Sequence, residues 1–420
     1  MPHLLWPCLL LAASAGGVHQ CTPGERYALS TLPVLEVAGI GVENESDEMW
    51  MRHLRRALPD ATLFIDVGFN KGYTAAQALA RWAPEAGLTP STLYAALVDG
   101  TGCVAETSAS RAPDGSPIVG CGITFLESAY QIDLCGEGAA RRCVWSPEEA
   151  AAAHADAEAV PRAAATPPFR VVAFDASRFA TRLWDHAAPL LPASATAAVE
   201  LHRMALGAAP APFVEFPTDG AEHRGINTCP DCATERVALE SLDNLMLAQL
   251  TALDATIDVL KVDAEGADID IIKGAAGLLA ANRVRSLLFE VHGKGSWTNT
   301  SLCRVVDYLD SLYGMACFHV GNTHFVALNN QCCADSHLDD LRTKGSTHRV
   351  AGSNVFCASR DAAPALVAEL EASPALLDPR TLDAECPEAF ERGSHERGSF
   401  RCGARAEAGL THLLQMERLT

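Results

Sequence analysis

The feature that most constrains the fold is an apolar run at residues 62–74 that ends in an acid and a glycine-spaced turn. The run Thr-Leu-Phe-Ile-Asp-Val-Gly-Phe-Asn-Lys-Gly-Tyr-Thr places Asp66 ahead of Gly68, Asn70 and Gly72. The apolar part predicts a buried strand, and the glycines allow backbone angles and a close ligand approach that side chains prevent. We therefore expect a strand that feeds a helix through a cofactor-binding loop, although such turns also occur without a ligand.

Two more segments predict strands that end in ionisable groups. Residues 256–274 show an apolar strand pattern followed by a turn and an amphipathic helix, and residues 284–292 show another strand pattern. In open α/β sheets the carboxyl ends of parallel strands border the ligand crevice. We therefore expect one crevice to receive the groups at these two strand ends, which are Asp263, Glu265, Glu290 and His292.

Strand and helix patterns alternate over most of the chain, which predicts an α/β fold with a doubly wound, mostly parallel sheet. Buried parallel strands need helices on both faces of the sheet. The remaining expected elements are strand 169–174, helix 178–190, strands 197–205 and 212–216, a strand and a helix within 235–250, helix 302–313, a hairpin at 315–329 and a last strand at 353–358.

The alternation stops between residues 87 and 168, where Gly, Ser, Pro and Ala dominate the sequence. This composition predicts an insertion with little core of its own, and such a segment needs cross-links to hold one shape. We expect two disulfides among its four cysteines, which are Cys103, Cys121, Cys135 and Cys143.

The N-terminus and the cysteine usage predict an exported protein. Residues 1–15 have the form of a secretory signal peptide, because a short apolar run precedes small residues, and the run is too short to span a membrane stably. The chain has 15 cysteines, and an even number remains once Cys8 leaves with the signal. An even number of cysteines favours disulfides, which form in an oxidising compartment. We therefore expect a secreted protein or one in the endomembrane lumen. Sequons at Asn44 and Asn299 permit N-glycans.

The charge balance argues against a nucleic-acid partner. Acidic residues outnumber basic ones, 52 against 32, and the formal net charge is −20. Phosphate binding depends on concentrated positive charge, and no cluster of Lys and Arg interleaved with aromatic residues occurs. The expected partner is a small molecule or a glycan, and the sequence predicts no oligomeric state.

The motif Cys229-Pro-Asp-Cys232 has three interpretations. It can contribute to disulfides, supply half of a zinc site, or act as a redox pair. Zinc would need further ligands such as His223 and the adjacent Cys332 and Cys333. We favour disulfides because the expected compartment is oxidising, and no thioredoxin-like strand precedes the motif.

Four segments stand out in this order along the chain: residues 66–73, 171–176, 240–245 and 260–267. Taken together, they resemble the FkbM-type S-adenosylmethionine-dependent methyltransferases. The resemblance implies a Rossmann-like methyltransferase domain over residues 61–360, with the 87–168 insertion inside it. Residues 16–60 and 361–420 would be N-terminal and C-terminal extensions, whose functions the resemblance does not address.

The resemblance also implies roles for the residues at the first two strand ends. Gly68, Asn70 and Gly72 would lie against the methionine part of S-adenosylmethionine, and Asp66 would reach its amino group. Asp175 would bind the ribose hydroxyls, because a carboxylate can accept two hydrogen bonds from a vicinal diol. Asp175 departs from the family pattern, since it lies far beyond the glycine turn and stands where Glu is common. Both aspartates can instead cap the helices that follow them.

The acids of the next strands would then face the methyl acceptor. A hydroxyl is a poor nucleophile until a base takes its proton, and Asp263 and Glu265 are the first candidates, with Glu290 and His292 beside them. These groups can also hold a divalent cation, although we predict no metal site, and His292 alone can be purely structural. The leading hypothesis is O-methylation of a glycan or a small hydroxylated metabolite. The alternative is a catalytically inactive binding or structural glycoprotein with the same fold.

Overall fold

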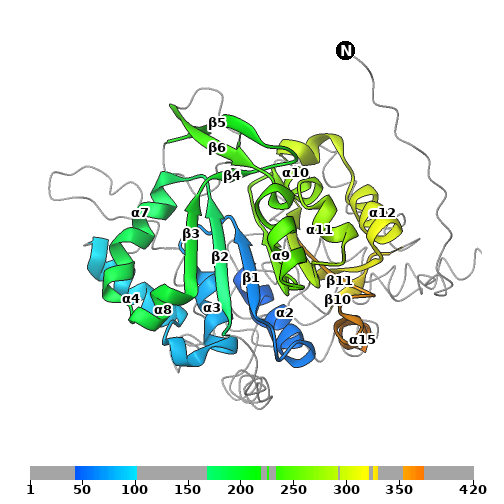
Figure 1. The fold of residues 1–420 in the computed structure, drawn as a ribbon, viewed down its shortest axis with the longest axis horizontal. Helices are drawn as coiled ribbons and strands as arrows, with labels where there is room; N and C mark the ends of the chain where they lie inside the picture. The colour runs from blue at the N-terminus through cyan, green and yellow to red at the C-terminus, as the bar shows by residue number, and fades with distance from the viewer. Residues whose placement is uncertain are drawn as a thin grey trace, which may run out of the picture.

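An eight-stranded, mostly parallel sheet forms the centre of the computed structural model (Figure 1). The structure describes residues 43–101, 168–218, 225–226, 233–291, 294–320, 325–329 and 353–372. The strand order is β10-β9-β11-β8-β7-β1-β2-β3. The strands are β1 (Leu63–Val67), β2 (Arg170–Asp175), β3 (Val199–Arg203), β7 (Val259–Val262), β8 (Ser286–Val291), β9 (Met315–Val320), β10 (Phe325–Ala327) and β11 (Ser353–Ser359).

The five strands from β3 through β2, β1 and β7 to β8 run parallel to one another. β11 lies between β8 and β9 and runs antiparallel to both, and β10 pairs antiparallel with β9. The predicted α/β fold with a mostly parallel sheet is therefore confirmed. The predicted hairpin at 315–329 is also confirmed as the β9–β10 pair.

Helices cover both faces of the main sheet, as its buried strands require. One face packs against α2, α3, α4, α7, α8 and α15, and the other packs against α9 to α12. These helices are α2 (Glu43–Ala57), α3 (Tyr73–Trp82), α4 (Pro90–Thr101), α7 (Arg178–Ala187), α8 (Ala193–Ala198), α9 (Ala248–Ala252), α10 (Asp268–Lys273), α11 (Ala276–Ala280), α12 (Leu302–Tyr313) and α15 (Pro364–Ala372). Short helical turns occur at 84–86, 188–190, 243–247 and 295–299.

The side chains of β1 show how one strand serves both cores. Leu63, Ile65 and Val67 enter the core under α9 to α12, whereas Phe64 enters the core under α2 and α3, because successive side chains point to opposite faces. Helix α2 is part of this second core, since its Trp50 is fully buried and stacks on Phe356 of β11.

A second, three-stranded sheet, which the strand patterns did not predict, adjoins one end of the main sheet (Figure 1). Its order is β4-β6-β5, formed by β4 (Ala205–Leu206), β5 (Ala211–Pro217) and β6 (Thr234–Glu240). The sequence predicted strands in these places but not their separation from the main sheet. The split arises because β5 and β6 pair antiparallel as a ribbon, and β4 pairs only with β6.

The start of the predicted insertion is more regular than its composition suggested. Helix α4 occupies residues 90–101, and it packs because Leu93, Ala96 and Leu97 follow the helical period and are buried. The four insertion cysteines, His292 and the Cys229-Pro-Asp-Cys232 motif lie outside the described residues, as do residues 1–15. A disulfide-rich insertion is therefore not supported by the structure.

One disulfide joins two strands of the sheet. Cys317 of β9 and Cys357 of β11 are direct cross-strand partners, and both side chains are buried. Among the described helices, none combines the length and the apolar composition needed to cross a bilayer.

Candidate active site

A cavity lies at the carboxyl ends of β1, β2 and β7, and we call it the crevice cavity. Within the sheet, β2 lies next to β1 on one side, and β7, which comes later in the chain, lies next to β1 on the other side. Open α/β sheets bind ligands where the strand order reverses in this way. The polar residues that line the cavity include Asn70, Asp175, Ser177, Asp263 and Glu265, and its apolar wall includes Phe174, Phe179, Met204, Leu206, Phe216 and Ile226.

Gly68 lets two strand ends come together at this cavity. Its φ is 84°, in the left-handed region, and a Cβ atom there would overlap the carbonyl oxygen of Asp263. The loop after β1 can therefore pack directly against the loop after β7. Gly72 also has φ 84°, but it is the N-cap of α3 and lies against the ring of Phe69. Of the three predicted loop residues, Gly68 and Asn70 therefore line the cavity, and Gly72 does not.

Asp175 is held at the cavity by two backbone groups. The N–H of Asn70 donates to its Oδ2 at 2.8 Å, and the N–H of Ser177 donates to its Oδ1 at 2.7 Å. Asn70 has φ 51°, and this left-handed turn brings together two residues that lie 105 positions apart in the sequence. The cap of α7 is Ser177, whose Oγ accepts from the N–H of Phe179, so the cap is not the Asp175 side chain.

Burial raises the pKa of Asp175 to about 6, and the two backbone hydrogen bonds lower it only in part. Each carboxylate oxygen accepts one N–H and keeps a lone pair for a further donor. The side chain can therefore accept two more hydrogen bonds from a ligand in the cavity.

Asp66 lies beneath the loop rather than in the cavity wall. Its side chain is fully buried, and Lys261 of β7 donates from Nζ to its Oδ1 at 3.1 Å. Its Oδ2 is buried and has no hydrogen-bond partner. Burial raises the pKa of Asp66, and the charge of Lys261 opposes that rise. Asp66 does not cap α3, whose N-cap is Gly72.

Lys261 joins the ends of β1 and β7, a role that the sequence analysis did not assign. Its Nζ also donates to the carbonyl oxygen of Gly68 at 3.4 Å and lies 3.4 Å from Oδ2 of Asp263. The strand around it is entirely buried. A lysine inside an otherwise apolar buried strand was the signal that could have identified it, because such a charge needs a partner.

Asp263 and Glu265 both line the crevice cavity, but their surroundings differ. The Asp263 side chain is 41% exposed, whereas that of Glu265 is 17% exposed and forms an ion pair with Lys294. Glu265 has φ 55°, an uncommon conformation for a residue with a side chain. The turn therefore holds Glu265 in place and leaves Asp263 more open to solvent.

Asp268 holds this turn together from below. Its side chain is fully buried, and its carboxylate accepts hydrogen bonds from the N–H of Gly266 at 3.1 Å and of Ala264 at 3.4 Å. Burial, and then the charge of Asp263, raises the pKa of Asp268 to about 7. Asp268 was not among the predicted site residues, although it follows the predicted acids in the same segment.

The third predicted strand end contributes nothing to the described cavity. Glu290 is buried within β8 and does not line the crevice cavity, and His292 lies outside the described residues. Within the part of the chain that the structure describes, no group of three or more His, Cys, Asp or Glu side chains could hold a metal ion.

Comparison with known proteins finds a family match for part of the chain. The family model of the methyltransferase FkbM domain matches residues 220–312, a segment that contains Asp263, Glu265 and Glu290. No curated protein and no solved structure matches the chain. The resemblance to the FkbM methyltransferase family is thereby confirmed for residues 220–312, which contain two of the four matching segments, 240–245 and 260–267. The other two segments, 66–73 and 171–176, lie outside the match.

Proposed function

We propose that this protein is an S-adenosylmethionine-dependent methyltransferase that acts on a hydroxyl group of a glycan or a small hydroxylated metabolite. The observation that carries the proposal is the position of Asp175. Its carboxylate borders a cavity at the reversal of strand order and has acceptor capacity left, in a chain that matches a methyltransferase domain.

The residues at the crevice cavity fit this cofactor chemically. Asp175 would accept hydrogen bonds from the ribose hydroxyls, and the loop of Gly68 and Asn70 would border the methionine part. The apolar wall, with Phe179 and Leu206, would cover the adenine. Asp66 stays the predicted partner of the amino group because its Oδ2 lacks a hydrogen bond, but the loop above this buried side chain would have to move for the ligand to reach it.

The cavity encloses only part of such a ligand. Its volume is about 110 Å³, whereas pockets that bury drug-sized ligands measure about 300–1,000 Å³. A nucleoside-sized cofactor would therefore extend out of the cavity along the open sheet edge, or widen the cavity as it binds.

S-adenosylmethionine, when bound, supplies the methyl group. The acceptor hydroxyl must lose its proton, and Asp263 or Glu265 would receive it. Lys261 and Lys294 hold these two acids at the edge of the cavity through ion pairs. Asp263 is the stronger candidate, because it is the more exposed of the two. Glu290 and His292 remain proposed for the far side of the acceptor.

A binding protein without turnover is the second candidate, and one observation favours it. Both candidate acids already have a lysine partner, so an acceptor hydroxyl would have to compete with that lysine for the carboxylate. This candidate shares the cofactor site with the first and differs only in the chemical step.

Two measurements separate these candidates. Calorimetric titration with S-adenosylmethionine tests the cofactor site, and Asp175→Ala should weaken binding by about tenfold or more, since it removes hydrogen bonds to a charged group. Asp270→Ala, a half-exposed acid on α10, is the matched control. Transfer of labelled methyl groups to a panel of hydroxylated acceptors then tests turnover. The absence of saturable binding would overturn both candidates, and binding without transfer would support the second.

We also propose that the protein is secreted or lumenal and glycosylated. The buried Cys317–Cys357 disulfide supports an oxidising compartment. Asn299, in one of the two sequons, is exposed to solvent. Intact mass of the protein from a secreting host, before and after glycosidase treatment, would show cleavage after residue 15 and any N-glycan.

A further inference from the structure

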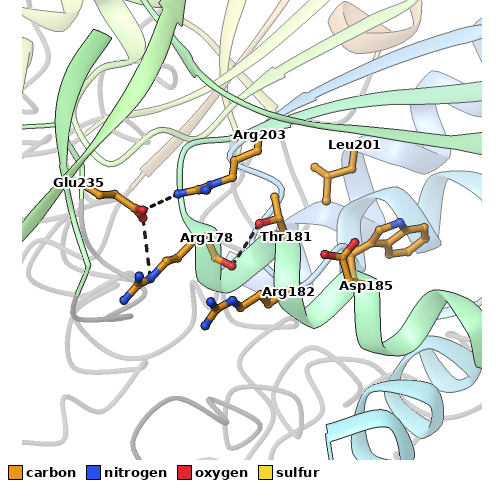
Figure 2. Close-up of a pocket in the computed structure, with 8 residues that line it drawn as sticks. Arg178, Thr181, Arg182, Asp185, Leu201, Arg203 and Glu235 are labelled. Carbon is orange, nitrogen blue, oxygen red and sulfur yellow. Dashed lines mark hydrogen bonds and ion pairs between the residues drawn. The ribbon is translucent and has the colours of Figure 1, made fainter.

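A second cavity lies between α7, β3 and β6, and we call it the arginine cavity (Figure 2). Its volume is about 560 Å³, within the range of about 300–1,000 Å³ that is usual for small-molecule sites. It shares no lining residue with the crevice cavity. The two cavities therefore are separate sites, and the following argument does not rest on the proposed methyltransferase activity.

Three arginines and one half-buried acid define the arginine cavity. Arg178 and Arg182 come from α7, Arg203 from β3, and Glu235 from β6 (Figure 2). Nη2 of Arg203 lies 2.6 Å from one oxygen of Glu235, and Nε of Arg178 lies 3.9 Å from the other. One carboxylate thus lies between two guanidinium groups and balances only one of their charges.

Arg182 adds a third positive charge to the lining. Its side chain forms no ion pair or hydrogen bond with another described residue, and it is exposed. The only other charged lining residue among those described is Asp185, about one helical turn beyond Arg182 on α7 (Figure 2), so the lining carries three positive and two negative groups. The cavity is therefore net positive in a chain whose formal net charge is −20.

Glu235 supplies a second kind of contact. Its Oε1 is buried and has no hydrogen bond, because the 3.9 Å separation from Arg178 is too long for one. A buried acceptor without a donor is costly, so a ligand hydroxyl placed there would gain a favourable hydrogen bond. The cavity thus presents cationic groups for an anion and an acceptor for a hydroxyl.

We propose that the arginine cavity binds a small molecule that carries both an anionic group and a hydroxyl, such as a sugar bearing phosphate, sulfate or carboxylate. The guanidinium fork matches the oxygen geometry of these anions and donates charge-assisted hydrogen bonds to them. Arg182 and Arg203 bind the anionic group, and Oε1 of Glu235 accepts a hydrogen bond from a hydroxyl.

The test is calorimetric titration of the full chain with glucose 6-phosphate, glucose 6-sulfate, glucuronate, glucose and inorganic phosphate. The three anionic sugars should show saturable binding, and their ranking identifies the preferred anion. Arg182→Gln should weaken the tightest of them by about tenfold or more, because one charge-assisted contact is lost. Arg304→Gln, an exposed arginine on α12, is the matched control and should change affinity by less than about twofold.

Glu235→Gln tests the hydroxyl contact separately. This variant removes a negative charge, so inorganic phosphate should bind at least as tightly as before. The preference for the sugar phosphate over inorganic phosphate should shrink, because an amide is the weaker hydrogen-bond acceptor. The proposal is overturned if no anionic sugar binds saturably, if Arg182→Gln matches Arg304→Gln, or if neutral glucose binds as tightly as the anions.

Discussion

The crevice cavity and the arginine cavity adjoin the same segment, residues 175–185, yet they are built from opposite charges. At the crevice cavity the buried or half-buried groups are carboxylates, and burial raises the pKa of Asp175 there to about 6. At the arginine cavity the lining groups are mainly guanidiniums. A chain that turns from strand to helix can thus present a strand-end acid on one side and helix-borne cations on the other.

The side chains of the two cavities are held in place by different kinds of contact. The crevice acids are fixed by backbone N–H groups and by a buried lysine, whereas the arginines extend on long side chains and are fixed mainly by Glu235. The two regions also touch, since Trp184, which lines the arginine cavity, packs edge-to-face on Phe69 of the glycine turn. Substitutions at the crevice should therefore affect stability more than substitutions among the arginines.

The largest expected effect follows from replacing Lys261 with methionine. The substitution leaves the buried Asp66 without its lysine partner, and breaking a buried ion pair in this way costs about 3–5 kcal/mol of unfolding free energy. Chemical denaturation measures the loss. The double variant Asp66→Asn, Lys261→Met should regain part of it, because the uncompensated buried charge is gone.

Lys273→Met provides the comparison on the surface. Lys273 forms a half-exposed pair with Asp270, and its loss should change the unfolding free energy by no more than about 0.5 kcal/mol. Equal losses for the two lysine variants would show that the crevice is no more tightly constrained than the surface.

The next effect concerns turnover rather than folding. Asp263→Asn or Glu265→Gln should reduce methyl transfer by a factor of about 10² or more and leave the affinity for S-adenosylmethionine within a few-fold, as expected for proton acceptors. Initial rates and calorimetric titration measure the two quantities. If a variant loses cofactor affinity without a separate effect on turnover, these acids belong to the cofactor pocket. If neither the rate nor the affinity changes, the proton acceptor lies elsewhere.

A smaller loss is expected from Gly68→Ala. The alanine meets both the strain of a left-handed backbone and overlap with the carbonyl oxygen of Asp263, so unfolding free energy should fall by about 2 kcal/mol or more, and cofactor binding should be lost. Gly314→Ala is the control, because φ there is 64° but the nearest atom to an added Cβ lies 4.0 Å away. It should cost about 1 kcal/mol through strain alone. Similar costs would mean that the close contact between the two loops is unimportant.

The elements that the sequence predicted well are those with local causes. The helix expected at 302–313 begins and ends at those residues, because Ser301 caps its start and Gly314 ends it in the left-handed conformation. The proximity of Asp175 to the glycine turn followed from strand-end placement, and the bond from Asn70 brings them together across the insertion.

What the sequence did not predict depends on distant contacts. The position of β11 inside the sheet is fixed by pairing with β8 and β9, which no local pattern reveals. The separate β4-β6-β5 sheet likewise follows from which strands pair. The arginine cavity could not be predicted from the sequence, because its residues come from three elements and form no motif.

The smallest expected effect is a change in the pH dependence of stability on replacing Asp268 with asparagine. Burial raises the pKa of Asp268 from 3.8 to about 7, so the folded state binds this proton more tightly than the unfolded state does. The stability linked to that proton is complete below about pH 4 and is lost as the pH rises to about 7.

An asparagine side chain cannot titrate, so the unfolding free energy of Asp268→Asn minus that of the wild type should become more positive as the pH rises from about 4 to about 7. Urea denaturation at several pH values measures this difference, and Asp270→Asn is the exposed control on the same helix. The charge of Asp263 contributes to the raised pKa, so in an Asp263→Asn background the same change should occur at lower pH. If the wild-type and Asp268→Asn curves instead run parallel across this range, Asp268 is ionised in the folded protein throughout, and the turn that carries Glu265 rests on a charged rather than a protonated support.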